Sequence, residues 1–414
     1  MKSNWTTATI DEVCSLVTDG AHNSPKSVEK GYYMASVKDF TEYGFNFLNC
    51  RQISEEDYEK LRKQGCVPQK EDVLVGKDGA RYFEDIIIYR QDEQPALLSS
   101  IAILRANRKK ITPEFLYYTL KTPTIKKDVR DNYGSGSAIP RIVLKDFKRM
   151  PFSYPDIDEQ RKITAVCSVI DEKIRVNNAI NENLQQQANL FFDELVGRLI
   201  PTMSDSNCSL QLHEIGSLDI LVTDYVANGS FKSLADNVQY LSQETDNVLI
   251  RLTDYNNNFS SDMVYISDES YNFLSKSKLY GDEIIISNVG ANVGTVFRCP
   301  RLDKRMSLAP NAIMLRSDKY EHYLYLYFIS HYGQQQLQSI VTGSAQPKFN
   351  KTNFRTLKVI LPDEATLNKI TDMYTPMYEQ IVSNYRENKA LANIRDSLLP
   401  KLMSGELDVS CVQI

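Results

Sequence analysis

The residues most suggestive of catalysis are two acidic segments at a defined spacing. Pro155-Asp156 is followed, after residues 157–170, by Asp171-Glu172-Lys173. In metal-dependent nucleases, two carboxylates arranged in this way hold Mg²⁺ and a lysine stabilises the developing charge. That chemistry needs the second carboxylate on a strand beside the first, whereas Asp171 and Lys173 fall inside a predicted long helix. A solvated helix face is therefore favoured, with a nuclease using Asp156, Asp171 and Lys173 as an alternative.

The sequence offers little support for other catalytic classes. Seven cysteines are scattered without a Cys-x-x-Cys pair, and we expect all of them to be free thiols. The four histidines, His22, His213, His322 and His331, form neither a metal-binding nor a triad pattern. A phosphate-binding Gly-Lys-Ser/Thr loop and the Asn/Asp-Pro-Pro-aromatic motif of DNA amino-methyltransferases are both missing. We therefore expect no catalytic residue, metal or cofactor on this chain.

Polar and basic clusters suit nucleic-acid contact, in which lysine and arginine reach phosphates while arginine, asparagine and glutamine read base edges. The overall charge of −5 and the pI near 5.6 argue the other way. Net charge sums over all faces, however, so a local basic surface remains compatible with an acidic chain. The candidate contacts are Lys77, Arg81, Tyr82, Arg108, Lys109, Ser137, Arg141, Asn288, Asn292, Arg298, Arg301, Ser344, Gln346 and Lys348.

The chain repeats itself, which relates these candidates to one another. Residues 136–195 align without a gap to residues 343–402, and Gly136-Ser137-Ala138-Ile139-Pro140-Arg141 lies on Gly343-Ser344-Ala345-Gln346-Pro347-Lys348. Upstream the similarity continues with slipping offsets. Such internal similarity indicates a tandem duplication. Because both copies keep this junction turn, we expect it to contact the DNA backbone or to act as scaffold. By contrast, the basic loop 76–82 corresponds to an amide-rich segment, 287–294, and would prefer different bases.

Each copy ends in a predicted long helix. Apolar positions alternate at spacings of three and four after Pro155 and again after Pro362, which is typical of a coiled coil. Matching asparagines in both seams would fix register, whereas Arg395 fits its seam position worst. We expect the helices to pair as an antiparallel rod of roughly 50 Å; two surface helices on separate cores are the alternative. The predicted seam comprises Ile163, Ile170, Ile174, Asn177, Asn181, Leu184, Phe191, Ile370, Met377, Ile381, Asn384, Asn388, Leu391 and Leu398.

The sequence thus predicts an α/β (α+β) protein made of a tandem pseudo-twofold repeat. Short β-rich runs separated by Gly, Asn and Asp turns precede each helix, and a length of 414 residues exceeds a single ordinary domain. We predict a globular domain at 1–155, a helix at 156–200, a second globular domain at 201–362, and a helix with its tail at 363–414. The longest apolar stretches are too short to span a membrane, so we expect a soluble cytoplasmic protein.

The order of these motifs resembles one family, the specificity subunits of type I restriction-modification systems. The resemblance rests on the tandem plan and on the Gly-Ser-Ala-x-Pro-[Arg/Lys] junction, which Phe147 or Phe354 follows. It also rests on the Asp158-Glu159-Gln160-Arg161-Lys162-Ile163 helix start and on the C-terminal segment 397–407. It covers essentially the whole chain, and the duplicated order of individually loose motifs makes it specific.

The resemblance implies a division of labour. Each globular part would be a target-recognition domain reading one half of a bipartite sequence in double-stranded DNA. The helix pair would set the gap and dock two modification subunits, which bring S-adenosylmethionine and methylate adenine. Restriction subunits using ATP and Mg²⁺ would complete the complex, so this chain itself would be non-catalytic. A two-headed protein scaffold that binds peptides, consistent with the acidic pI, is a further alternative.

Overall fold

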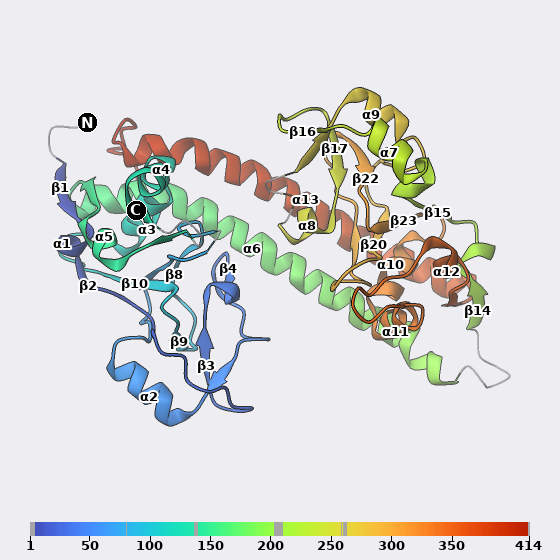
Figure 1. Ribbon diagram of the computed structural model, residues 1–414, viewed down its shortest axis with the longest axis horizontal. Coiled ribbons are helices and arrows are strands. Elements are labelled where there is room, and N and C mark those ends of the chain that lie inside the picture. Colours follow the sequence, from blue (N-terminus) through green and yellow to red (C-terminus); the bar gives the residue numbers. More distant parts are fainter. Residues whose placement is uncertain are drawn as a thin grey trace. The chain divides into compact units, whose positions relative to one another are not determined.

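The chain forms two compact units. The computed structural model describes residues 5–79, 81–135, 140–202, 210–257, 259 and 263–412. Unit 1 comprises Met1–Arg175 together with Ala390–Ile414, and unit 2 comprises Val176–Lys389. The N-terminal strands and the end of the last helix therefore belong to one unit (Figure 1). Two helices, α6 (Ile157–Leu195) and α13 (Glu364–Met403), contribute to both units.

Unit 1 is built on an antiparallel four-stranded sheet in the order β2-β10-β7-β8, with a three-stranded sheet β6-β3-β9 beside it. Its strands are β1 (Thr6–Thr9), β2 (Cys14–Asp19), β3 (Tyr32–Ala35), β4 (Phe40–Thr41), β5 (Gly44–Phe45), β6 (Gln52–Ile53), β7 (Val73–Gly76), β8 (Ile86–Ile88), β9 (Ala96–Leu97), β10 (Ile101–Ala106), β11 (Gly134–Ser135), β12 (Arg141–Ile142) and β13 (Pro151–Tyr154). Its own helices are α1 (Ile10–Val13), α2 (Glu55–Lys63), α3 (Pro113–Lys121), α4 (Pro123–Asp128) and α5 (Leu144–Arg149).

Unit 2 repeats this plan with a larger second sheet. Its four-stranded sheet has the order β15-β23-β20-β21, and a five-stranded sheet runs β16-β18-β17-β22-β19. The strands are β14 (Gln211–Glu214), β15 (Leu221–Asp224), β16 (Tyr240–Leu241), β17 (Asn247–Ile250), β18 (Val264–Ile266), β19 (Lys278–Leu279), β20 (Ile284–Ser287), β21 (Val296–Arg298), β22 (Arg305–Leu308), β23 (Ala312–Arg316) and β24 (Lys358–Leu361). The helices are α7 (Phe231–Asn237), α8 (Leu252–Asn256), α9 (Asp268–Phe273), α10 (Glu321–Ile329), α11 (His331–Ser339) and α12 (Lys351–Arg355).

The central strand of each unit is buried on both faces, which explains its uninterrupted apolar sequence. In β7, Val73 and Val75 face the core that contains α3. Leu74 faces the opposite core, which contains Ala35 and Phe45. In β20, Ile284 and Ile286 pack against the core that contains α10, and the intervening Ile285 packs against β17. The predicted α/β architecture with a duplicated plan is confirmed.

The two long helices begin at equivalent aspartates. The side chain of Asp156 accepts a hydrogen bond from the backbone N–H of Glu159 (2.9 Å), and that of Asp363 accepts one from Thr366 (2.8 Å). An aspartate at this position satisfies a free N–H of the first turn and complements the helix dipole. The Pro-Asp pair of each junction is therefore a helix-start signal.

Within each unit, α6 and α13 pack antiparallel. In unit 1 Arg395 contacts Asp171, and in unit 2 Asn388 contacts Asn177 while Asn384 contacts Asn181. As the residue number falls on one helix it rises on the other.

The buried positions depart from a strict 3.5-residue period, and the predicted seam residues Ile170, Leu184, Met377 and Leu391 are only partly buried. Phe192 and Leu399 are buried, whereas the predicted Phe191 and Leu398 are only partly buried. An α-helix with 3.6 residues per turn drifts in this direction when it packs on a globular core and not on a supercoiled partner.

The C-terminal tail completes the core of unit 1. Leu402 and Val409 are buried in the same cluster as Ile163 of α6. Gly405, with φ of +68°, lies against the ring of Trp5, where an added Cβ would come within 3.2 Å of the indole. Among the described residues, no helix is long and apolar enough to cross a membrane.

Candidate nucleic-acid interface

In each unit the structure joins two segments that the sequence singled out separately. The β7–β8 loop (residues 76–83) lies against junction segment 1 (residues 140–142), and the β20–β21 loop (residues 287–294) lies against junction segment 2 (residues 347–349). Each loop follows a fully buried strand, so a rigid sheet positions it.

The same backbone hydrogen bonds hold the two loops. Gly79 N–H donates to the carbonyl of Pro140 (3.0 Å), and Gly290 N–H donates to that of Pro347 (2.9 Å). Two residues away on each segment, across the Asp78–Arg141 bridge, the Lys77 carbonyl accepts a hydrogen bond from Ile142 N–H (3.0 Å). The equivalent bond in unit 2 joins the Asn288 carbonyl to Phe349 N–H (3.1 Å).

The loops also close internally in the same way. Phe83 N–H donates to the Gly76 carbonyl, and Gly294 N–H donates to the Ser287 carbonyl. The two copies therefore share one backbone frame.

A glycine at the turn of each frame shapes its outer surface. Gly79 and Gly290 both have φ of +98°, a conformation that side chains with a Cβ rarely adopt. Among the described residues, no atom lies within 4 Å of a Cβ built at either position. The backbone conformation, and not the packing, therefore requires glycine at these two positions. The space around each glycine leaves the turn open for close approach of another molecule.

The frames carry different side chains. Read in register, Gly76-Lys77-Asp78-Gly79-Ala80-Arg81-Tyr82-Phe83 corresponds to Ser287-Asn288-Val289-Gly290-Ala291-Asn292-Val293-Gly294. Arg81 and Asn292 are both exposed, whereas Phe83 and Gly294 are both buried. Of the remaining candidates at the junctions, Arg141, Ser344, Gln346 and Lys348 are exposed, and Ser137 lies outside the described residues.

Several predicted DNA contacts have protein partners within the chain. Lys77 is buried, and its Nζ lies 3.2 Å from Oδ2 of Asp19. The side-chain N–H of Asn288 donates to the Phe349 carbonyl (3.1 Å). Arg108 pairs with Glu71, while Lys109 is exposed and Tyr82 half-buried.

Arg298 and Arg301 belong to a cluster between β21 and α13. Arg298 is 8% exposed, contacts Glu321 at 2.8 Å, and lies over the rings of Tyr325 and Tyr378. Arg301 donates to both carboxylate oxygens of Glu379. These guanidinium groups hold α13 to the domain core.

Burial shifts the titration of the groups beside Arg298. Burial and the positive charge of Arg298 lower the pKa of His322 to about 4, and the neutral ring accepts a hydrogen bond from Arg298 through Nδ1 (2.8 Å). Burial raises the pKa of Glu321 to about 7, although Arg298 opposes that shift. The cluster is internal, so direct base contact would require it to open.

A second paired feature is a buried aspartate at the end of the first strand of each four-stranded sheet, whose role the sequence did not predict. Asp19 in β2 and Asp224 in β15 occupy matching Leu-Val-Thr-Asp segments. Asp19 pairs with Lys77, but Asp224 pairs with Lys351 at the start of α12 (3.0 Å). The aspartate is kept in both copies while its lysine partner comes from a different element, so the repeat in the sequence shows the aspartates but not their partners.

The nuclease alternative is not supported. Asp156 caps α6, and Asp171 accepts hydrogen bonds from Tyr118 (2.6 Å) and Arg395 (2.6 Å). These contacts are structural, because they satisfy the carboxylates within the protein. Within the ranges given above, no group of three His, Cys, Asp or Glu side chains could hold a metal ion.

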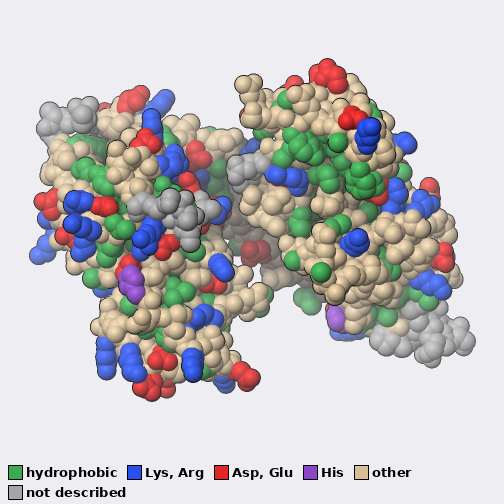
Figure 2. Space-filling model, in the orientation of Figure 1, with side chains coloured by type: hydrophobic (Ala, Val, Ile, Leu, Met, Phe, Trp, Pro, Cys, Tyr) green, Lys and Arg blue, Asp and Glu red, His purple; other side chains and the backbone are tan. Residues whose placement is uncertain are grey.

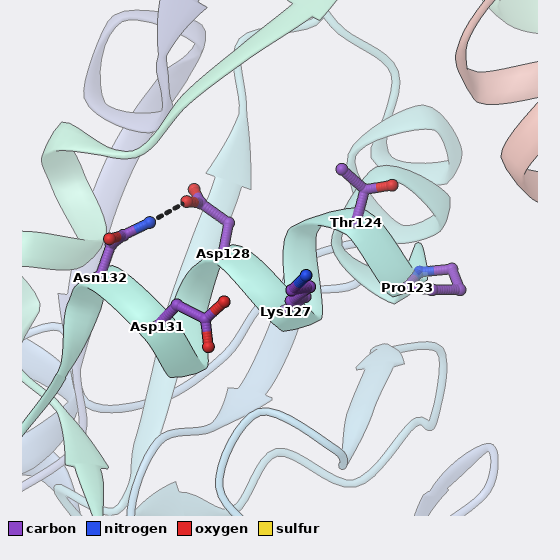
Figure 3. Close-up of a pocket in the computed structure, with 6 residues that line it drawn as sticks. All are labelled: Pro123, Thr124, Lys127, Asp128, Asp131 and Asn132. Atoms are coloured by element: carbon purple, nitrogen blue, oxygen red, sulfur yellow. Dashed lines mark hydrogen bonds between the residues drawn. The ribbon is translucent and has the colours of Figure 1, made fainter.

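Surface charge and shape add little to this picture. On the face shown in Figure 2, basic and acidic side chains are interspersed over each unit. One hollow of about 410 Å³ lies on α4 and the turn after it. Figure 3 shows that Asn132 and Asp128 there bond to each other (2.6 Å). Its lining is Pro123, Thr124, Lys127, Asp128, Asp131 and Asn132, a set without a buried reactive group.

Comparison with known proteins agrees with the duplicated plan. The family model for the type I restriction modification DNA specificity domain matches residues 2–186 and 231–392. The type I restriction enzyme MjaIX specificity subunit of Methanocaldococcus jannaschii is 24% identical over 72% of this chain and 70% of its own length. The HindI specificity subunit of Haemophilus influenzae is 20% identical over 87% of this chain and 91% of its own length.

A solved structure supports the fold. The S subunit of a type I restriction-modification system from M. genitalium matches with a TM-score of 0.53 and 15% identity, covering 97% of both chains. Since the family model matches well over half of the sequence, in two segments that follow the internal repeat, this chain belongs to the type I restriction-modification DNA specificity domain family.

Proposed function

We propose that this chain is the specificity subunit of a type I restriction-modification complex and that each unit reads one half of a bipartite DNA target. The single observation that carries the proposal is the shared loop frame with different exposed side chains. A frame common to both copies provides the same docking geometry, while the side chains on it provide different base preferences. The boundaries we propose for the two recognition domains are 1–155 and 201–362.

The helix pair would set the gap between the half-sites. Its polar contacts support this role, because Asn181 accepts from Asn384 (2.7 Å) and Asn388 donates to Asn178 (2.8 Å). Sliding one helix along the other would separate these amides from their partners and leave the buried Asn181 and Asn384 without the hydrogen bond that joins them. A fixed register gives the helix pair a fixed length.

Modification subunits would dock on the same helices. Val169 and Leu190 of α6 are 70% and 71% exposed, and Ile394 of α13 is 49% exposed. These exposed apolar side chains are available for contact with a protein partner. The methyl transfer from S-adenosylmethionine to adenine, and the ATP-dependent and Mg²⁺-dependent reactions, would then belong to the modification and restriction subunits. The complex would work on DNA in the cytoplasm.

Mapping adenine methylation in the host genome tests the proposal. Long-read sequencing would compare strains with this gene intact, deleted and restored on a plasmid. We expect a two-part methylated motif with a fixed gap that disappears on deletion and returns on restoration. Methylation that is unchanged in a strain expressing both this gene and its methyltransferase would refute the proposal. A two-headed protein scaffold would then be the better interpretation.

A binding experiment provides an independent check. The chain purified with its modification subunits should bind DNA with an affinity that falls steeply with salt, because phosphate contacts release counterions. Binding that is insensitive to salt would contradict a DNA-reading role.

A further inference from the structure

We propose that Arg81 and Asn292 are equivalent base-reading residues, and that Arg81 reads guanine while Asn292 reads adenine. The inference rests on the proposed function and assigns specificity to one position in each recognition domain. It follows from comparing the two loops position by position.

The shared frame fixes where each loop residue points. The bonds from Gly79 to Pro140 and from Gly290 to Pro347 place the following residues at the same point of the same turn. Burial agrees between the copies at most described loop positions, except that Lys77 is buried and Asn288 half-buried, and residue 81 or 292 is exposed in each. Arg81 is 70% exposed.

The other described loop positions are less suited to reading bases. Lys77 is buried against Asp19, and the Asn288 amide donates to Phe349. Asp78 and Val289 lie in bridges to the junction segments, and Tyr82 is half-buried. Among the loop residues that the structure describes, only position 81 or 292 combines exposure with a side chain that can contact a base edge bidentately.

The chemistry of the two side chains differs in a defined way. The guanidinium group of arginine donates to both O6 and N7 of guanine, whereas the asparagine amide donates to N7 and accepts from N6 of adenine. In the free protein Arg81 donates to Asp85 through Nη2 (2.8 Å). An exposed ion pair of this kind contributes little to stability, so DNA can displace Asp85 at small cost.

The test uses the full chain assembled with its modification subunits and a pool of bipartite targets with randomised half-sites. We expect Asn292→Arg to change one position of the second half-site from adenine to guanine. Arg81→Asn should make the opposite change in the first half-site. Arg81→Lys, which keeps the charge but loses the fork, should reduce discrimination at that position roughly 5- to 100-fold. The gap and all other bases should stay the same.

Controls separate the possible outcomes. Arg62 of α2 is 59% exposed and pairs with Glu59, so Arg62→Asn matches the chemistry of Arg81→Asn away from the loop and should leave the motif unchanged. Thermal unfolding would confirm that each variant is folded. If the wild-type complex selects a bipartite motif but the variants keep every base, or lose affinity equally for all sequences, the base-reading assignment is wrong. If the wild-type complex selects no motif, the proposed function itself fails.

Discussion

The buried ion pair between α6 and α13 allows a quantitative test of how unit 1 is held together. Asp171 and Arg395 have side chains only 14% and 13% exposed, and their closest atoms are 2.6 Å apart. Arg395→Met would remove this partner from the Asp171 carboxylate. Among the described residues outside α6, the hydroxyl of Tyr118 would then be its remaining hydrogen-bond partner. Breaking a buried pair typically costs about 3–5 kcal/mol, and residual exposure reduces this to about 2–4 kcal/mol here.

Replacing both members should behave differently. Asp171→Leu combined with Arg395→Met removes both charges and keeps apolar volume, so we expect stability within about 1 kcal/mol of wild type. The double-mutant cycle should therefore give a coupling energy of at least about 2 kcal/mol. Near-additive effects of the two single substitutions would refute the reasoning.

The assay can isolate unit 1. Trp5 is the only tryptophan of the chain and packs against Phe115 in the core of that unit. Urea unfolding followed by its fluorescence therefore reports on unit 1. Arg161→Met, which removes an exposed arginine that pairs with Asp158 on the same helix, should shift stability by less than about 0.5 kcal/mol. An Arg395→Met protein that unfolds at the wild-type midpoint would show that the pair does not stabilise the unit.

Three further changes have defined outcomes. The pKa of His322 is about 4 in the folded protein and 6.5 normally. As pH falls from 6.5 to 4, the imidazole is protonated in the unfolded chain but not in the folded protein. His322 therefore lowers the free energy of unfolding over this pH range. Glu321, whose pKa is raised to about 7, acts in the opposite direction, because its contribution to stability is lost as pH rises from 4.5 to 7. His322→Asn should therefore make the protein lose less stability, or gain more, than wild type as pH falls from 6.5 to 4, measured by chemical unfolding at each pH; an unchanged profile would contradict the assigned burial. A second change removes one heptad from each helix, Asn178–Leu184 together with Ile381–Glu387. This double deletion keeps the antiparallel register and shortens the helix pair by about 10 Å. The recognised gap should therefore shrink by about three base pairs, while the half-site bases stay the same. Altered half-site bases in that methylation motif would show that the helices do not set the gap. Gly290→Ala should destabilise unit 2 by about 1–2 kcal/mol through backbone strain alone, visible as a lower Tm, and no change would mean that the positive φ is not required.

Much of the fold could be predicted because it depends on local patterns. Buried strands such as β7 and β20 appear as apolar runs, and the Pro-Asp pairs mark where α6 and α13 begin. The internal repeat then implies two similar units. The limits of periodicity appear at Phe192 and Leu399, where packing on a globular core replaces packing on a partner helix.

The candidate site was less predictable because its geometry is tertiary. The sequence suggested Lys77 and Arg298 as DNA contacts, but it gave no sign of their partners Asp19 and Glu321. It also presented Arg395 as a misfit and Asp171 as part of a possible metal site. The two residues are partners, and an antiparallel register was needed to see it.

The discontinuous make-up of unit 1 has a consequence for how the protein forms during synthesis. Unit 2 is one uninterrupted stretch, Val176–Lys389. The translation of unit 1 begins first, but Leu402 and Val409 of its core are made only after the whole of unit 2. Domains generally fold as units once their residues are available. The N-terminal domain should therefore remain incompletely packed until residues 399–409 have been made, and a chain truncated before Leu399 should yield a folded second domain beside an unstable first one.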